Sequence, residues 1–291
     1  MNKKGASVPA WADIGASQHI GNRKSQQDSF LHAWLPTVSA RDADAGRLLL
    51  AVADGMGGHA AGDVASRLVI NALASTAKDN PRAASQEILR RGLEAASAAL
   101  FERGAADERL KSMGSTLTAV IIEREKDAFA YHMVTVGDSP LWHWRAKNKT
   151  MERANLDQSL AGALERDVAA GRVSPSEAEN DPRRYQSNVL TSALLAASEG
   201  EYEIDSTDDP RPISSEDTLL LASDGIETLS EVDISETLKK GIKRQKPASQ
   251  ITDYLIEQVL AKKEDDQDNA TILIARPGIK SSTGGFFGLF G

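Results

Sequence analysis

Apolar, β-rich runs recur along this chain, and several are continuous rather than alternating between apolar and polar residues. They cover residues 48–53, 115–122, 128–136, 141–144, 218–222 and 270–275. Continuous apolar strands are typical of sheets covered on both faces, whereas a sheet with one wet face alternates. The runs therefore predict strands that are buried between other layers of the molecule.

Helical patterns lie among these runs in two pairs, at residues 63–78 and 85–103 and again at 230–242 and 248–263. Apolar side chains recur in them at helical spacing; in the last one, Ile251, Leu255 and Leu260 are expected to face one way. Strands in groups with helices in pairs, rather than strict alternation of the two, favour sheets packed together with helices outside.

The composition is that of an ordinary globular protein, with 41% hydrophobic and 26% charged residues. The net charge of −8 argues against a protein that binds nucleic-acid phosphates, which needs a clustered basic surface. The absence of Cys excludes disulfides, thiolate zinc sites and a cysteine nucleophile. No apolar stretch is long enough for a signal peptide or a membrane span, so a cytoplasmic protein is expected.

Five acidic residues share one context, because each lies at the polar edge of an apolar strand run. They are Asp28, Asp54, Asp138, Asp224 and Asp268. A single aspartate of this kind, especially before glycine, is usually a turn residue that caps its own backbone. Five together favour a different interpretation: if the sheets bring these strand ends to one edge, the carboxylates crowd and need compensating positive charge. Oxygen ligands without Cys favour hard ions, Mg²⁺ or Mn²⁺, over Zn²⁺.

A glycine-rich segment follows Asp54. Gly55, Gly57 and Gly58 permit a sharp turn that brings a backbone carbonyl close to a metal. A loop that cradles phosphate is the alternative, but the segment lacks the Lys-Ser/Thr and the glycine spacing of a P-loop.

Six motifs resemble those of the protein phosphatase 2C-like, metal-dependent (PPM) family, in the family's order and from about residue 12 to 276. They are Arg23-Lys24-Ser25-Gln26-Gln27-Asp28, Asp54-Gly55-Met56-Gly57-Gly58-His59, Gly114-Ser115-Thr116, Gly137-Asp138-Ser139, Ser223-Asp224-Gly225 and Asp268-Asn269. Any one motif alone is weak, whereas six in order are specific. The form of the second motif is similar to that of bacterial members.

The resemblance implies a ligand set for two core ions, Mn²⁺ or Mg²⁺, and a third, weaker one. Asp54 would bridge the core ions, and the Gly55 carbonyl would also be a ligand. Asp224 and Asp268 would complete the second ion's shell, where Asp28 would act through water. Asp138, together with Asp224, would hold the third ion. Arg23 would bind the substrate phosphate.

The resemblance also implies a fold and an activity. The fold would be an α+β, four-layer α–β–β–α sandwich of two mostly antiparallel sheets, with the metals at one end. The activity would be hydrolysis of phosphoserine and phosphothreonine in proteins, which reverses a Ser/Thr protein kinase. A catalytically inactive phosphopeptide-binding module of the same fold is the alternative.

Three departures from the family pattern stand out. Gln26 and Gln27 lower the charge near the second metal but leave Asp28 in register. Pro140 replaces an Arg that often follows Gly-Asp-Ser, so a surface interaction is expected to be missing. Met56 stands where eukaryotic relatives often have His as a proposed proton donor, so the general acid is not identified, and His59 is expected to be structural.

Two segments flank the expected catalytic core of a single domain, residues 1–276. Residues 157–188 form a polar segment with a capping box at Ser174–Glu177, either an inserted flap or a plain helical connection. In it, Arg183 and Arg184 are expected to be a solvated pair rather than a substrate contact. Residues 277–291 form a tail expected to be flexible. Its apolar tip is a candidate docking peptide with four large side chains: Phe286, Phe287, Leu289 and Phe290.

Overall fold

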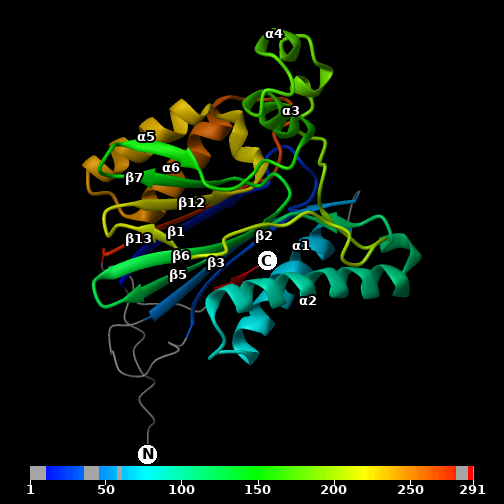
Figure 1. Ribbon diagram of the computed structural model, residues 1–291, viewed down its shortest axis with the longest axis horizontal. Coiled ribbons are helices and arrows are strands. Elements are labelled where there is room, and N and C mark those ends of the chain that lie inside the picture. Colours follow the sequence, from blue (N-terminus) through cyan, green and yellow to red (C-terminus); the bar gives the residue numbers. More distant parts are fainter. Residues whose placement is uncertain (1–10, 36–45, 58–60, 280–287, 291) are drawn as a thin grey trace, which may run out of the picture.

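The computed structural model describes residues 11–35, 46–57, 61–279 and 288–290 of the chain. Two antiparallel sheets pack face to face, and a pair of helices covers the outer face of each (Figure 1). This confirms the expected four-layer α–β–β–α sandwich. No helix in the described ranges is long and apolar enough to cross a membrane.

The smaller sheet contains five strands in the order β1-β13-β12-β7-β8. They are β1 (Ala12–His19), β13 (Ala270–Pro277), β12 (Thr218–Ala222), β7 (Leu141–Arg145) and β8 (Thr150–Arg153). Strand β13, the last of these five strands in the sequence, lies between β1 and β12. In the pairing with β1, Ala12 lies opposite Pro277.

The larger sheet contains nine of the described strands, with the main order β10-β6-β5-β3-β2-β14. These are β10 (Asp205–Ser206), β6 (Ala128–Val136), β5 (Leu117–Glu125), β3 (Gly46–Met56), β2 (Asp28–Leu35) and β14 (Gly288–Phe290). Three short strands extend its edges: β4 (Gly114–Ser115), β9 (Leu194–Leu195) and β11 (Arg211–Ile213). In β14, the backbone of the C-terminal segment pairs with β2, so that Leu289 lies opposite Leu31.

Helices α1 (Ala61–Asp79) and α2 (Ser85–Ala106) pack on the larger sheet, and α5 (Glu231–Lys243) and α6 (Ala248–Ala261) pack on the smaller one (Figure 1). Strand β3 shows why its apolar run is continuous. Leu49 and Ala51 face the α1–α2 layer, while Leu48 and Leu50 face the other sheet. Both faces of the strand are therefore dry.

The predicted apolar stripe of α6 is wrong at one position. Ile251 and Leu255 are buried as expected, but Leu260 is 37% exposed and Val259 is buried in its place. Val259 follows Leu255 by four residues and so stays on the same face, whereas Leu260 is rotated away from it.

Residues 157–188 form three short helices that project from the sandwich beside one end of the sheets (Figure 1). They are α3 (Leu160–Ala169), α4 (Pro175–Ala178) and the 3₁₀ helix η2 (Pro182–Tyr185). The predicted capping box is present at the start of α4, since the Ser174 hydroxyl accepts from the Glu177 N–H and the Glu177 carboxylate accepts from the Ser174 N–H. Arg183 forms ion pairs with Asp167 and Asp181 rather than lying free in solvent.

Candidate active site

Asp28 and Asp54 are adjacent across two strands, because Asp28 at the start of β2 pairs in register with Asp54 near the end of β3. Asp28 is only 3% exposed. Its Oδ2 accepts hydrogen bonds from the hydroxyls of Ser223 and Thr271, both at 2.7 Å. Thr271 lies in β13 of the smaller sheet, and Ser223 directly follows β12 of the same sheet. Asp28 therefore links the two sheets at the end where Asp54 lies.

A pocket of about 500 Å³ opens at this end of the sandwich. Six of the seven predicted site residues line it: Arg23, Asp54, Gly55, Asp138, Asp224 and Asp268. Asp28, the seventh, is not among the lining residues, and its role through water stays a prediction. The predicted strand ends therefore meet at one edge, with Asp54 from the larger sheet and Asp224 from the 3₁₀ helix η3 (Asp224–Thr228) that follows β12.

The carboxyl groups raise one another's pKa. Burial raises the pKa of Asp28 to about 7, and the carboxylates of Asp224 and Asp268 add to this. The pKa of Asp54 lies well above its ordinary value because of burial and then because of Asp28 and Asp224. Burial and neighbouring acids also raise the pKa of Asp138 and Asp224. A cluster that resists ionisation in this way is one that a bound cation stabilises.

The donor set fits a hard divalent ion. The buried Oδ1 atoms of Asp28 and Asp224 have no hydrogen-bond partner in the described part of the chain. Buried carboxylate oxygens are normally satisfied, so these two are available as ligands or as acceptors from bound water. Within the described ranges, no three His, Cys, Asp or Glu side chains are arranged to hold an ion by themselves. The expected set also includes the Gly55 carbonyl and water.

The comparisons with known proteins agree with this geometry. The family model for protein phosphatase 2C matches residues 15–268. The chain belongs to the protein phosphatase 2C family. The predicted resemblance is confirmed.

Among the relatives of this phosphatase 2C chain are bacterial serine/threonine phosphatases. PstP from Mycobacterium tuberculosis is 33% identical over 79% of this chain, but the chain spans only 40% of the length of that relative. The phosphatase stp of Listeria welshimeri is 32% identical over 78% of this chain and 83% of its own length.

Solved structures show the same fold. A crystal structure of the Mycobacterium tuberculosis phosphatase PstP/Ppp covers 92% of this chain and 99% of its own, with 30% identity and a TM-score of 0.71. A structure of the PstP catalytic domain in complex with two manganese ions has 29% identity and a TM-score of 0.67, over 91% and 97% of the chains.

The family's Gly-Ser-Thr motif positions Asp54 in this phosphatase 2C chain. The Thr116 N–H donates to the Asp54 carbonyl, and the Asp54 N–H donates to the Thr116 hydroxyl, both at 2.9 Å. The Thr116 hydroxyl also contacts the hydroxyl of Ser139 at 2.8 Å, which follows Asp138. One buried threonine thus connects the backbone of Asp54 to the side chain of Ser139, the residue after Asp138.

The glycine after Asp54 is required by packing. A Cβ at Gly55 would lie 1.9 Å from the carbonyl oxygen of Gly62 in α1, so a side chain there cannot be accommodated. Gly57 has φ +125°, a conformation that favours glycine. Gly58 and His59 lie outside the described residues, so the expectation that His59 is structural stays a prediction. Met56 lines the pocket.

Arg23 lies at the pocket, but its guanidinium already has an acidic partner. Its Nη2 is 2.7 Å from Oδ2 of Asp268, and both side chains are partly exposed. The loop that carries Arg23 is held by Asn269, whose side chain donates to the Ile20 carbonyl and accepts from the Gln27 N–H. Asp268 therefore faces both the pocket and the residue predicted to bind phosphate.

Arg153 in β8 is a site residue that the sequence analysis missed. Its Nη2 donates to the Asp138 carbonyl at 2.5 Å, and its Nη1 lies 3.3 Å from Asp157 and 3.5 Å from Glu227. Burial raises the pKa of Glu227 to about 7, although Arg153 acts in the opposite direction. A guanidinium thus contacts the Gly-Asp-Ser loop despite Pro140. Because Asp138 and Glu227 lie 15 and 74 residues from Arg153 in the chain, no local motif could have identified it.

Proposed function

We propose that the protein removes phosphate from phosphoserine and phosphothreonine in other proteins by metal-dependent hydrolysis. The proposal rests on the convergence of carboxyl groups from both sheets on one pocket, with two buried carboxylate oxygens that lack partners among the described residues. Family membership supports the same activity.

Bound Mn²⁺ or Mg²⁺ would supply positive charge at the phosphoryl group and lower the pKa of water in the site toward neutrality. Asp54, with the Gly55 carbonyl, would hold two core ions together. Asp224 and Asp268 would complete the second ion's ligands, with Asp28 acting through water. Asp138, with Asp224, would hold a third, weaker ion.

The remaining roles belong to side chains around the ions. Arg23 would exchange its partial contact with Asp268 for the phosphoryl oxygens, which a guanidinium matches with two parallel hydrogen bonds. The chain has no Cys, so no thiol-based phosphoenzyme can form. Met56 has no proton to give, so the leaving oxygen must be protonated by another group or by water.

The flap, residues 157–188, contributes to the substrate side of the pocket. Asn188 at its end, together with Leu190, lines the cavity. Its helix α4 buries no side chain and is stabilised by its own caps. Such a segment can vary in sequence without disturbing the core, so we infer that it selects among phosphorylated proteins made by a Ser/Thr kinase.

We further propose that residues 1–276 act as one catalytic domain and that the C-terminal tail serves for docking. Phe286 and Phe287 lie outside the described residues. The backbone of Leu289 and Phe290 pairs with β2, so a docking partner would meet this segment at the edge of the larger sheet.

The test is turnover of a phosphothreonine peptide and of p-nitrophenyl phosphate, after EDTA treatment and again with added Mn²⁺. Turnover that requires metal supports the proposal. Peptide binding without turnover in the presence of Mn²⁺ would instead identify a catalytically inactive regulatory module.

A further inference from the structure

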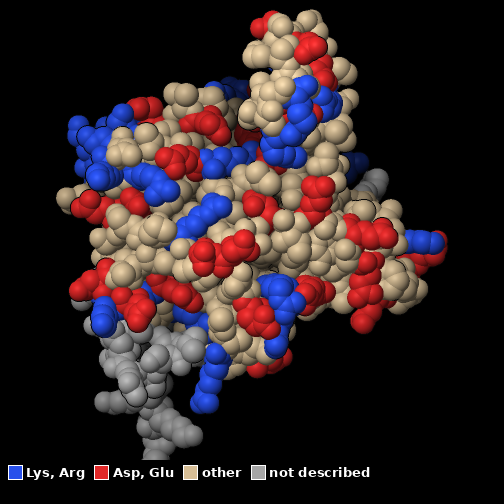
Figure 2. Space-filling view, in the orientation of Figure 1, with Lys and Arg blue, Asp and Glu red and all other residues tan. Residues whose placement is uncertain are grey.

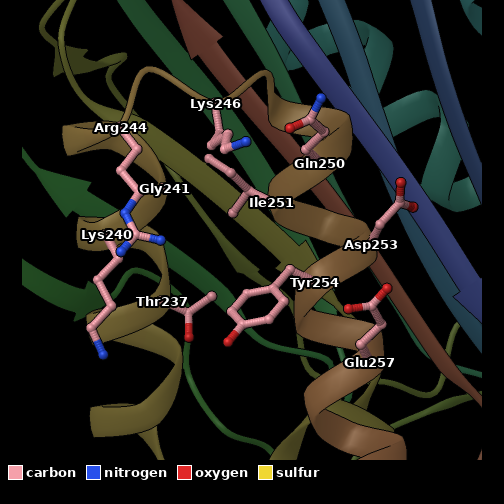
Figure 3. A pocket seen from close by; sticks show the side chains of 10 residues that line it. All are labelled: Thr237, Lys240, Gly241, Arg244, Lys246, Gln250, Ile251, Asp253, Tyr254 and Glu257. Carbon is pink, nitrogen blue, oxygen red and sulfur yellow. The ribbon is translucent and has the colours of Figure 1, made fainter.

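A second pocket, of about 410 Å³, lies between α5 and α6, in the helical layer over the smaller sheet (Figure 3). None of the predicted metal ligands lines it. Its volume is in the range of pockets that bind small molecules. The sequence analysis assigned it no function.

The α5 side of this pocket is basic. Residues 237–252 contain five Lys or Arg and no Asp or Glu, in a chain whose net charge is −8. Lys240, Arg244 and Lys246 line the cavity. Figure 2 shows Lys and Arg side chains gathered over this end of the molecule.

These three cations have no carboxylate within ion-pair distance in the part of the chain that the structure describes. Other lysines nearby do have one: Lys239 lies 3.0 Å from Glu236, and Lys262 lies 3.4 Å from Asp233. Attraction to the negative C-terminal end of α5 accounts for cations in its last turn, but not for Lys246 beyond the helix.

The backbone of Lys246 is held in place by hydrogen bonding to the smaller sheet. Its carbonyl accepts a hydrogen bond from Arg276 at 2.8 Å, and Arg276 is a buried residue of β13 paired with Asp13 at 3.3 Å. Asp13 also accepts from the Ala248 N–H at 2.9 Å. The loop that presents Lys246 is therefore anchored to the sheet by a buried ion pair.

Gly241, which lines the pocket, has no side chain to separate α5 from α6. A Cβ there would lie 2.7 Å from the side chain of Ile251, so the two helices approach closely at this point. The ring of Tyr254, which is 52% exposed, forms part of the opposite wall (Figure 3). The α6 wall also carries Asp253 and Glu257, so the cations face a wall that is partly aromatic and partly acidic.

We propose that this pocket binds a nucleoside polyphosphate. The three cations would bind its phosphate chain, and the ring of Tyr254 would stack on its base. Three cations match a chain of phosphates, and an aromatic face stacks on a base. The proposal goes beyond the phosphatase activity and does not depend on it.

The experiment is calorimetric titration of the full chain with ADP and, separately, with inorganic triphosphate, in EDTA so that the metal site does not contribute. Both ligands are expected to bind one site. Affinity should fall at least tenfold in the Lys240→Gln/Arg244→Gln variant, since two exposed charges are lost without disturbing the core. The matched control is Lys239→Gln, which should change affinity less than twofold.

Tyr254→Leu separates the two ligands. It should weaken ADP several-fold and leave triphosphate unchanged; an equal effect on both would overturn the nucleotide assignment. No binding of either ligand, or equal losses in the control variant, would overturn the phosphate site. Binding of hexaglutamate alone would also overturn it, in favour of an acidic protein partner. Peptide turnover with Mn²⁺ should be unchanged in these variants, so a failure of the phosphatase proposal would be seen separately.

Discussion

Asp28 and Asp54 lie opposite each other in the register of β2 and β3. Asp28 also accepts hydrogen bonds from the hydroxyls of Ser223 and Thr271, which come from the smaller-sheet side of the sandwich. Carboxyl groups this close cannot all ionise without a cation. At the proposed metal site, the carboxylates therefore repel one another in the metal-free protein. In the metal-bound protein, the shared ion would hold the two sheets together.

Asp54→Asn should have opposite effects on stability in the two states. In EDTA it removes one of the crowded charges, and we expect unfolding free energy to rise by about 1–2 kcal/mol, the equivalent of roughly one pKa unit. With Mn²⁺ it should remove most metal-dependent stabilisation and lower kcat by orders of magnitude. Denaturant melts with and without metal, together with peptide assays, check this.

Asp138→Ala is the control for that experiment. It should spare the tight metal sites while still lowering turnover, since Asp138 is proposed to hold only the third ion. Wild-type turnover in Asp54→Asn would refute the mechanism.

Metal should stabilise the fold as well as permit catalysis. Ligands come from both sheets, so an ion that binds only the folded chain adds about 2.7 kcal/mol at a hundred times its Kd. The melting temperature should therefore rise with Mn²⁺ concentration, and activity should be lost in EDTA. Full activity after exhaustive EDTA treatment would contradict a site of hard oxygen ligands.

Arg23→Ala should chiefly raise KM, because a guanidinium that binds the substrate phosphate contributes about 1.5–3 kcal/mol through charged hydrogen bonds. Neighbouring Lys24→Ala is the control, with little change expected. Unchanged KM and kcat in Arg23→Ala would show that Arg23 serves only its contact with Asp268.

Arg153→Gln should destabilise the protein by about 1.5–3 kcal/mol, since the Asp138 carbonyl loses a charged hydrogen-bond donor and Glu227, whose side chain is 38% exposed, loses a weaker ion pair. It should also weaken the third metal site, which calorimetry can measure. Arg145→Gln in the same hairpin is the control: it removes an exposed pair with Glu152, worth less than about 1 kcal/mol. Equal stability losses in the two variants would count against a role for Arg153.

His143 should make stability fall in mild acid. Burial lowers its pKa below the ordinary 6.5, although the bond to Asp217 at 3.1 Å acts in the opposite direction. The unfolded chain takes up a proton as pH falls through about 6.5, whereas the folded chain does so only at lower pH. The stability of wild type relative to His143→Gln should therefore be greatest above this value and decrease toward pH 5. Parallel pH profiles of the two proteins would exclude this role.

Much of the architecture could be predicted because its strands are buried on both faces. The runs that became β3, β5, β6, β7, β12 and β13 are continuous and apolar for that reason. Strand β1 was missed since it is a partly exposed strand that, among the described residues, pairs with β13 alone. Its sequence, with Gly15, Ser17 and Gln18, carries little of the apolar signal.

Some residues of the candidate site could also be predicted from the sequence, and others could not. Asp54 and Asp224 could be found because Asp54 lies near the end of the buried strand β3 and Asp224 follows the buried strand β12 by two residues, which are local patterns. Arg153 could not, because Asp138 follows β6 of the larger sheet and reaches Arg153 in β8 only after the two sheets have packed, and Glu227 is 74 residues away in the chain. Sequence spacing reports where a strand ends, but not which distant side chain reaches across to it.

The position of β13 in the smaller sheet affects when the protein can fold during translation. Strand β13 inserts between β1 and β12, although it is synthesised last of the three. Until residue 277 has left the ribosome, β1 lacks the strand with which it pairs, and Asp28 lacks the Thr271 hydroxyl that donates to it. The nascent chain therefore cannot complete the carboxyl cluster before β13 has been synthesised, and the proposed activity can begin only after that point.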